Sequence, residues 1–567
     1  MKKKRIIFVL VIVLLIVILV VLFYFKISFT GNFIFSPKPV YSNIDQQISF
    51  EQMKQVGQDL NNDFLNKGYW VKQGNFSYLS TNDCVALINA LGSCLGFNPA
   101  SPYGLVFIPR YPNDSNMETI FLPGSNLSDT FKLRGDEAIV IMGITPPKSK
   151  FTSYVPYLFT RNMKNQDPYT ILKNIQFFTS AGFNFSEIQN IGNTFSGYIQ
   201  PGRFPYLAAL GHSIHDDIMN SSNRSNENFN GAFVIVFTAD KNIYNSIIND
   251  MKNNIFPKYN INANIINQIQ IPSDFVNLGF DNLSDDFQIL NRLAYSQGEE
   301  GKEYLRDPKV VVYRIVPKKE NKFSKKFKYS PTANKSTGIS ELQYNNSLNL
   351  LSQAVKIYYD KSTRIVNSTR SGVKATNYFI ENCTYEGFSC LVDSPEASYI
   401  GSGRGNITES SDDFFLFVGL NHVKTNKASY QNFAFTNTYG MAYGSLNDGM
   451  FAGSTDRFVD IIKNMKNISE ETRNELLNNI DKFFVYKISR VCNNESYCYQ
   501  IPINTLICKN NVTNKVEYCN PPGVAGIDEN NPYFMSLERA YDDPFGRLGP
   551  SYNEVLAPIG IRYIPRV

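Results

Sequence analysis

An internal repeat constrains the fold of this chain more than any other feature of its sequence. Residues 136–160 (DEAIVIMGITPPKSKFTSYVPYLFT) align without a gap with residues 412–436 (DDFFLFVGLNHVKTNKASYQNFAFT). The identical pairs are Asp136/Asp412, Gly143/Gly419, Lys148/Lys424, Ser153/Ser429, Tyr154/Tyr430, Phe159/Phe435 and Thr160/Thr436. Most positions between them are apolar in both copies, which is typical of a buried strand, a polar loop and a second buried strand.

Two further matches keep the same order along the chain. Upstream, CLGFNPASPY (94–103) is similar to CLVDSPEASY (390–399), and downstream KVVVYRI (309–315) is similar to KFFVYKI (482–488). Three matches in one order predict a chain built from two duplicated lobes.

The domain boundaries follow from this repeat. We expect a first lobe at residues 71–317 and a second lobe, ending in disulfide-stapled hairpins, at residues 338–567. The Lys-rich tract at 318–337 indicates a solvated linker, with a patch for polyanions or lipid headgroups as the rival interpretation. Residues 26–70 are predicted to form a stalk, and residues 1–5 a cytoplasmic tail.

The first lobe is longer than the second between its matched segments. The surplus contains an apolar strand at 231–240, an amphipathic helix pattern at 241–256 and another strand at 264–272. Helices are also expected at 342–359 and 469–482. The predicted fold class is α+β: a single N-terminal transmembrane helix followed by two β-rich, duplicated lobes with mixed sheets and a strand-helix-strand insertion in the first.

The transmembrane prediction rests on residues 6–25 (IIFVLVIVLLIVILVVLFYF), an uninterrupted apolar run. A helix of about 20 residues spans about 30 Å, the thickness of the hydrocarbon core of a bilayer. The alternative is a cleaved signal peptide, but no small-residue cleavage site follows the run. The preceding KKKR favours a cytoplasmic N-terminus. This pattern predicts a single-pass protein held in the lipid bilayer, with its body extracellular, luminal or on a virion envelope.

The net charge of the chain limits the classes of partner that can be expected. The 55 Lys and Arg and 50 Asp and Glu give a net charge of +5. Five bases flank the apolar run, so the remainder of the chain is neutral; they are Lys2, Lys3, Lys4, Arg5 and Lys26. A neutral body offers no general electrostatic footprint for nucleic acid, and no nucleic-acid partner is predicted.

The eight cysteines form four local pairs. These are Cys84/Cys94, Cys383/Cys390, Cys492/Cys498 and Cys508/Cys519. Such short brackets predict disulfides formed in an oxidising compartment, each closing a local loop. A zinc site built from the last four cysteines is the alternative, but their spacing lacks the close CxxC pairs of structural zinc.

Several N-x-S/T sequons make glycosylation plausible in an exported protein. The candidates are Asn75, Asn126, Asn184, Asn367, Asn406 and Asn511. The competing interpretation is that an Asn-rich composition produces sequons by chance.

One histidine cluster is a weak candidate for a metal site. On a helix, His212 and His215 would share a face, and Asp216 could supply a third ligand for zinc, iron or copper. A solvated helix end is the competing interpretation. No cofactor is predicted, and a metal ion is considered only at this cluster.

The duplicated loops offer candidate binding residues, because functional residues are often found on loops at strand ends. They are Lys148 and Tyr154 in the first copy and Asn421, His422, Lys424 and Tyr430 in the second. The competing interpretation is a plain turn with a solvated histidine.

Three functions remain open on the sequence alone. The favoured one is a non-catalytic, glycosylated surface or envelope protein that binds a protein or glycan partner through both lobes. The alternatives are a membrane-anchored extracellular hydrolase with a site between the lobes and a self-assembling coat component. Binding is favoured over catalysis because the chain has only three histidines, the usual groups that titrate near neutral pH.

Overall fold

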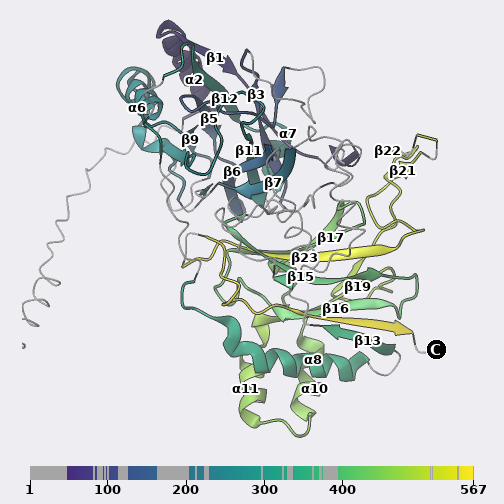
Figure 1. Ribbon diagram of the computed structural model, residues 1–567. Helices are drawn as coiled ribbons and strands as arrows, with labels where there is room; N and C mark the ends of the chain where they lie inside the picture. The colour runs from purple at the N-terminus through teal and green to yellow at the C-terminus, as the bar shows by residue number, and fades with distance from the viewer. Residues whose placement is uncertain are drawn as a thin grey trace, which may run out of the picture. The chain divides into compact units, whose positions relative to one another are not determined.

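The computed structural model is β-rich, with mixed sheets and few helices (Figure 1). It describes residues 48–80, 83–85, 88, 94, 98, 101–112, 126–162, 203–210, 213–216, 218–222, 229–294, 298–321, 325–327, 336–359, 363–369, 373–374, 394–510, 512–513, 515–545 and 548–565. Residues 48–567 form one compact unit.

Lobe one contains two main sheets and a layer of helices. The first sheet has the order β1 (Tyr69–Gln73), β12 (Val310–Pro317), β5 (Ala138–Ile144), β9 (Ala232–Thr238), β10 (Ile266–Gln270). The second has the order β2 (Asn75–Tyr78), β3 (Tyr103–Pro109), β11 (Asp286–Ala294), β6 (Phe151–Asn162), β7 (Arg203–Ala209), with β4 (Leu127–Ser128) and β8 (Ile214–His215) beside it. The helices that pack on the first sheet are α2 (Phe50–Asn66) and α6 (Lys241–Asp250), while α7 (Gly298–Arg306) lies beside β2 of the second sheet.

Strand β5 shows why the inner strands of the first sheet, such as β5 and β9, are continuous apolar runs. Its Ile139 and Ile141 pack in the core between the two sheets. Its Val140 and Met142 point to the opposite face and pack with helices α2 and α6. Since both faces of the sheet are covered, the strand is a continuous apolar run rather than an alternating one.

Lobe two is built in the same way. Its first sheet has the order β13 (Thr363–Thr369), β24 (Ile559–Pro565), β16 (Phe414–Leu420), β19 (Phe483–Ser489), β20 (Cys498–Gln500). Its second has the order β14 (Val373–Lys374), β15 (Ala397–Asn406), β23 (Tyr533–Tyr541), β17 (Tyr430–Thr436), β18 (Ala442–Asn447). Helices α8 (Asn345–Tyr359), α10 (Val459–Asn464) and α11 (Glu470–Asn478) cover the first sheet (Figure 1). A small hairpin, β21 (Ile507–Lys509) and β22 (Val516–Tyr518), stands apart from both sheets.

The two lobes correspond strand by strand. In each first sheet the last described pair, β9/β10 or β19/β20, is parallel and the other pairs are antiparallel. In the second sheets, Arg292 lies opposite Tyr103 and Arg539 lies opposite Tyr399, the two tyrosines aligned by the upstream sequence match. Each guanidinium lies over the tyrosine ring opposite it, 5.4 and 5.7 Å from the ring centroid. The sequence match and the sheet register therefore place the same residues in equivalent positions.

This correspondence corrects two expectations from the sequence. The downstream match paired β12 with β19, but β12 lies at the sheet position of β24, and β19 lies at that of β9. Strand β9 is consequently not part of an insertion, because lobe two has a strand at the same position. The lobes differ instead in where their helices fall: α6 joins β9 to β10, whereas α10 and α11 precede β19.

The structure does not support the N-terminal transmembrane helix on which the predicted fold class and localisation relied. Within the described part of the chain, no helix is both long and apolar enough to cross a membrane. Residues 6–25, on which the prediction of a single-pass protein rested, lie outside the described residues.

The structure also changes the description of two predicted segments, the stalk and the linker. Helix α2 falls within the predicted stalk at 26–70, but it starts at a capping box formed by Ser49 and Gln52 and packs its apolar face into the core of lobe one. The predicted linker is not solvated throughout, because Phe327 is buried and its N–H donates to the carbonyl of Ala239.

In lobe one, the close approach of a neighbouring backbone explains why the repeat has a glycine at position 143. A Cβ on Gly143 would lie 2.0 Å from the carbonyl oxygen of Lys309, a backbone atom directly before the neighbouring strand β12. We expect Gly143→Ala to lower the free energy of unfolding by about 1–3 kcal/mol, because the paired backbone cannot move aside without cost. Gly135→Ala is the control, since its Cβ would meet only Leu278 at an ordinary 3.7 Å. Urea unfolding checks both, and equal midpoints would contradict the steric explanation.

Candidate functional site

The two duplicated loops are the best-defined candidates for a functional surface. Each joins a strand of the first sheet to one of the second: residues 145–150 connect β5 to β6, and residues 421–429 connect β16 to β17. Lys148 and Lys424, which occupy matched positions, are both exposed. The prediction that these lysines contact a partner stays a prediction.

The structure brings the ends of the two loops together. Phe151 begins the strand after the first loop, Tyr430 begins the strand after the second, and both are buried in one apolar cluster with Tyr541. The rings of Phe151 and Tyr541 lie 5.0 Å apart. Beside this cluster, the ammonium of Lys150 lies 3.8 Å from the carboxylate of Asp448. The C-terminal ends of the two loops therefore lie close together in one region of the structure.

Three of the residues proposed for partner binding are buried instead. Tyr154 and Tyr430 lie in apolar clusters, and burial raises the pKa of both hydroxyls above the ordinary range. Asn421 is buried as well, and its side-chain oxygen accepts hydrogen bonds from the N–H groups of Val423 and Lys424 at 3.1 and 3.2 Å. Because they are buried, these three side chains are not exposed to a partner in this structure.

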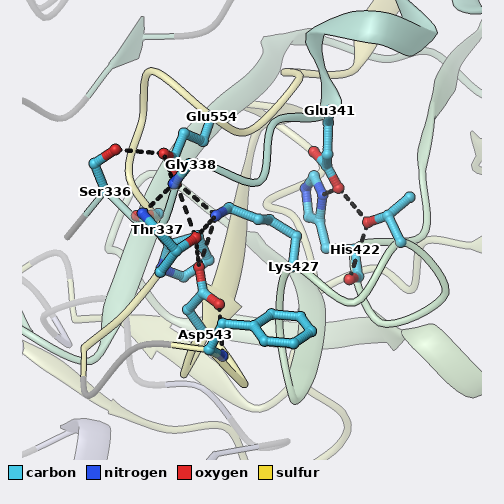
Figure 2. Close-up of polar contacts among 12 residues, drawn as sticks. Ser336, Thr337, Gly338, Glu341, His422, Lys427, Asp543 and Glu554 are labelled. Carbon is cyan, nitrogen blue, oxygen red and sulfur yellow. Dashed lines mark hydrogen bonds and ion pairs between the residues drawn. The ribbon is translucent and has the colours of Figure 1, made fainter. Parts of the chain in front are cut away.

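His422, also a candidate binding residue, is buried, which fits neither an exposed contact residue nor the competing interpretation of a solvated turn. Its Nδ1 lies 2.8 Å from Glu341 and its Nε2 lies 3.2 Å from Glu538 (Figure 2 shows the pair with Glu341). Burial alone would lower the pKa of His422, but the two carboxylates raise it to about 10. Burial also raises the pKa of Glu538, an effect that the imidazolium opposes. The histidine is therefore a fixed positive charge at neutral pH, not a group poised to exchange protons.

Lys427 forms a second buried ionic contact within the same loop. Its ammonium lies 2.7 Å from Asp543 and 2.6 Å from Glu554, and the lysine side chain is fully buried (Figure 2). It also donates to the hydroxyl of Thr337 at 2.9 Å. The sequence analysis missed this lysine, and nothing in its local sequence distinguishes it from the neighbouring exposed Lys424.

Residues at the end of the inter-lobe linker also form hydrogen bonds with Glu554. The Glu554 carboxylate accepts hydrogen bonds from the hydroxyl of Ser336 and from the N–H groups of Thr337 and Gly338, the last two at 3.1 and 2.8 Å. Burial would raise the pKa of Glu554, but the hydrogen bond from Lys427 and those from the linker lower it to about 2. Residues 336–338 are thus bound to lobe two.

These contacts hold the second loop in one conformation. The N–H of Lys427 donates to the carbonyl of His422 at 2.7 Å, so the two anchored side chains flank a tight turn that presents Lys424. The first loop has no counterpart of His422; it carries Pro146 and Pro147, whose rings restrict the backbone directly. Both loops are therefore preorganised, by different means.

The weak metal site does not have the predicted geometry. His215 lies in the short strand β8 opposite Ser153, not on a helix, and successive residues of a strand point to opposite faces. Asp216 accepts a hydrogen bond from the N–H of Thr152 at 3.1 Å. His212 lies outside the described residues. Among the residues that are described, no group of three His, Cys, Asp or Glu side chains could hold a metal ion.

Three of the four predicted disulfides are confirmed: Cys84–Cys94, Cys492–Cys498 and Cys508–Cys519. Cys383 and Cys390 lie outside the described residues.

Glycosylation stays a prediction. Asn75, Asn126 and Asn406 are exposed. Asn367 lies in β13, whose side chains are not described, and Asn184 and Asn511 lie outside the described residues.

Comparison with known proteins assigns no family to the chain. No protein family and no curated protein matches it. Among solved structures, VPA0106 of Vibrio parahaemolyticus is similar at 8% identity and a TM-score of 0.30, over 92% of this chain and 98% of that one. An uncharacterized protein of Burkholderia cenocepacia is similar at 7% identity and a TM-score of 0.32, over 91% of this chain and 86% of that one. Neither similarity is close enough to support an argument about function.

Proposed function

We propose that this protein binds a partner through the two duplicated loops, 145–150 and 421–429, acting as one bilobal face. The observation that carries the proposal is the shared cluster of Phe151, Tyr430 and Tyr541, which joins the bases of the two loops. A partner large enough to contact one loop can therefore reach the other. The exposed lysines at 148 and 424 favour a partner that carries acidic groups.

Preorganisation supports this proposal. Binding requires loops and side chains to be ordered, and a loop that is already rigid loses less conformational entropy when a partner binds. The prolines of the first loop and the buried ion pairs of His422 and Lys427 in the second provide this rigidity before any partner is present.

The proposal is tested by charge reversal in both loops. We expect Lys148→Glu combined with Lys424→Glu to weaken binding about tenfold or more, about 1.4 kcal/mol, while the fold is retained because both side chains are exposed. Partners captured by cross-linking to the wild-type protein are identified, and their affinities for each variant are measured by calorimetry.

The matched control reverses the same number of charges elsewhere. Lys252 and Lys466 are exposed lysines on the helical side of lobe one and lobe two. Lys252→Glu combined with Lys466→Glu should bind as the wild type does. Equal losses in the two double variants would show a nonspecific charge effect and contradict a binding face at the loops, as would full binding by the loop variant.

A further inference from the structure

The hairpin β21–β22 belongs to lobe two by sequence but packs against lobe one. Ile507 and Val516, one from each of its strands, are buried in the same apolar cluster as Leu105 and Tyr157 of lobe one. Near this contact, the N–H of Cys94 in lobe one donates to the carbonyl of Tyr439 in lobe two at 2.8 Å. The hairpin therefore contributes to the attachment of one lobe to the other.

Such a hairpin has little stability of its own. Each strand has three residues, and the pair makes no sheet contact with any other described strand. An isolated two-stranded hairpin is at best marginally stable in water. The disulfide Cys508–Cys519 joins one strand to the residue that follows the other, which closes the hairpin into a ring and restricts its unfolded conformations.

This disulfide is also the most accessible of the three that are described. Cys508 is exposed. By contrast, Cys84 and Cys94 are 0% and 1% exposed, and Cys492 is 7% exposed, while its partner Cys498 is partly buried, as Cys519 is. Thiol–disulfide exchange requires an attacking thiolate to reach a sulfur atom, and among the six cysteines that the structure describes only Cys508 is exposed, so this bond is the one most readily attacked.

We propose that Cys508–Cys519 is a redox-sensitive clasp between the lobes. A small dithiol attacks the exposed Cys508 sulfur, the bond between Cys508 and Cys519 breaks, and the second thiol of the reagent displaces Cys508 from the mixed disulfide. The protein gains two thiols and the reagent becomes a cyclic disulfide, so two electrons and two protons pass to the protein. Without the ring the hairpin unfolds, and Ile507 and Val516 leave their site on lobe one. This inference is independent of the proposed binding function.

The first test uses the wild-type protein and dithiothreitol. Thiols released over time are alkylated and located by mass spectrometry, while hydrogen exchange is followed at the amide of Cys94. We expect Cys508 and Cys519 to be alkylated faster than the other four cysteines that the structure describes, and at least about tenfold faster than Cys84 and Cys94, because access limits exchange at buried sulfurs. Exchange at Cys94 should rise at the same time. Release of all the cysteines at equal rates, or unchanged exchange at Cys94, would overturn the proposal.

The second test separates the clasp from a general loss of stability. Cys508→Ser with Cys519→Ser removes the clasp, and Cys492→Ser with Cys498→Ser removes a disulfide whose loop packs within lobe two. The first variant should show raised exchange at Cys94 without any reductant and no further rise when dithiothreitol is added. The second should behave as the wild type does at Cys94. The same behaviour in both variants would reject a specific clasp.

Discussion

Replacing Lys427 with methionine is expected to lower the free energy of unfolding by about 3–5 kcal/mol. The lysine is fully buried between Asp543 and Glu554. Methionine fills a similar volume but leaves the two carboxylates close together in a site with little solvent, without the ammonium that offsets their desolvation. Urea unfolding at neutral pH measures the effect.

The matched control for this variant is Lys424→Met, three residues away in the same loop. Lys424 is exposed, so its replacement should change stability by no more than about 0.5 kcal/mol. A loss at position 427 no larger than that at position 424 would show that the buried contact contributes nothing to the fold.

His422→Gln is the second substitution with a large expected effect, also about 3–5 kcal/mol, because it leaves Glu341 and Glu538 in a buried site without their shared counter-charge. The effect should depend on pH. In the folded protein the pKa of His422 is raised to about 10, whereas in the unfolded chain it is about 6.5. The stabilisation is therefore complete below about pH 6.5 and is lost as the pH rises toward 10.

Unfolding titrations of the wild type and His422→Gln between pH 6 and 10 test this dependence. The difference in unfolding free energy between the two proteins should shrink steadily across that window. A difference that stays constant, or that grows with pH, would mean that the histidine is not held in its charged form by the glutamates. Because this side chain is structural, its loss is expected to reduce binding only through the conformation of the second loop.

The strands were largely predictable from the sequence, while their partners were not. Runs such as GAFVIVFTAD indicate a buried strand, because apolar side chains on both faces require covered faces. KVVVYRI and KFFVYKI look alike for the same reason, since any strand buried on both faces has this composition. Only the pairing of β12 with β1 and β5, and of β19 with β16 and β20, shows that they occupy different places.

The buried ionic contacts escaped the sequence analysis for a related reason. Lys427 and Glu554 are 127 residues apart, and His422 and Glu341 are 81 residues apart. Nothing in the polar loop GLNHVKTNKASY distinguishes a buried histidine or lysine from a solvated one, because burial here depends on distant segments that fold over the loop. What the sequence did indicate was the repeat, which placed Lys148 and Lys424 at equivalent positions.

The two loops of the bilobal face are held in their conformations by different interactions, so we expect changes of pH to affect them differently. The prolines of the first loop restrict the backbone through covalent bonds, which neither acid, base nor salt can alter. The second loop depends on charged groups, among them the Glu554 carboxylate, whose pKa is lowered to about 2, and the His422 imidazolium, whose pKa is raised to about 10. As the pH rises toward 10 and His422 loses its proton, we expect the second loop to lose part of its support while the prolines of the first loop still restrict their backbone, so a bound partner should lose contact with the second loop first.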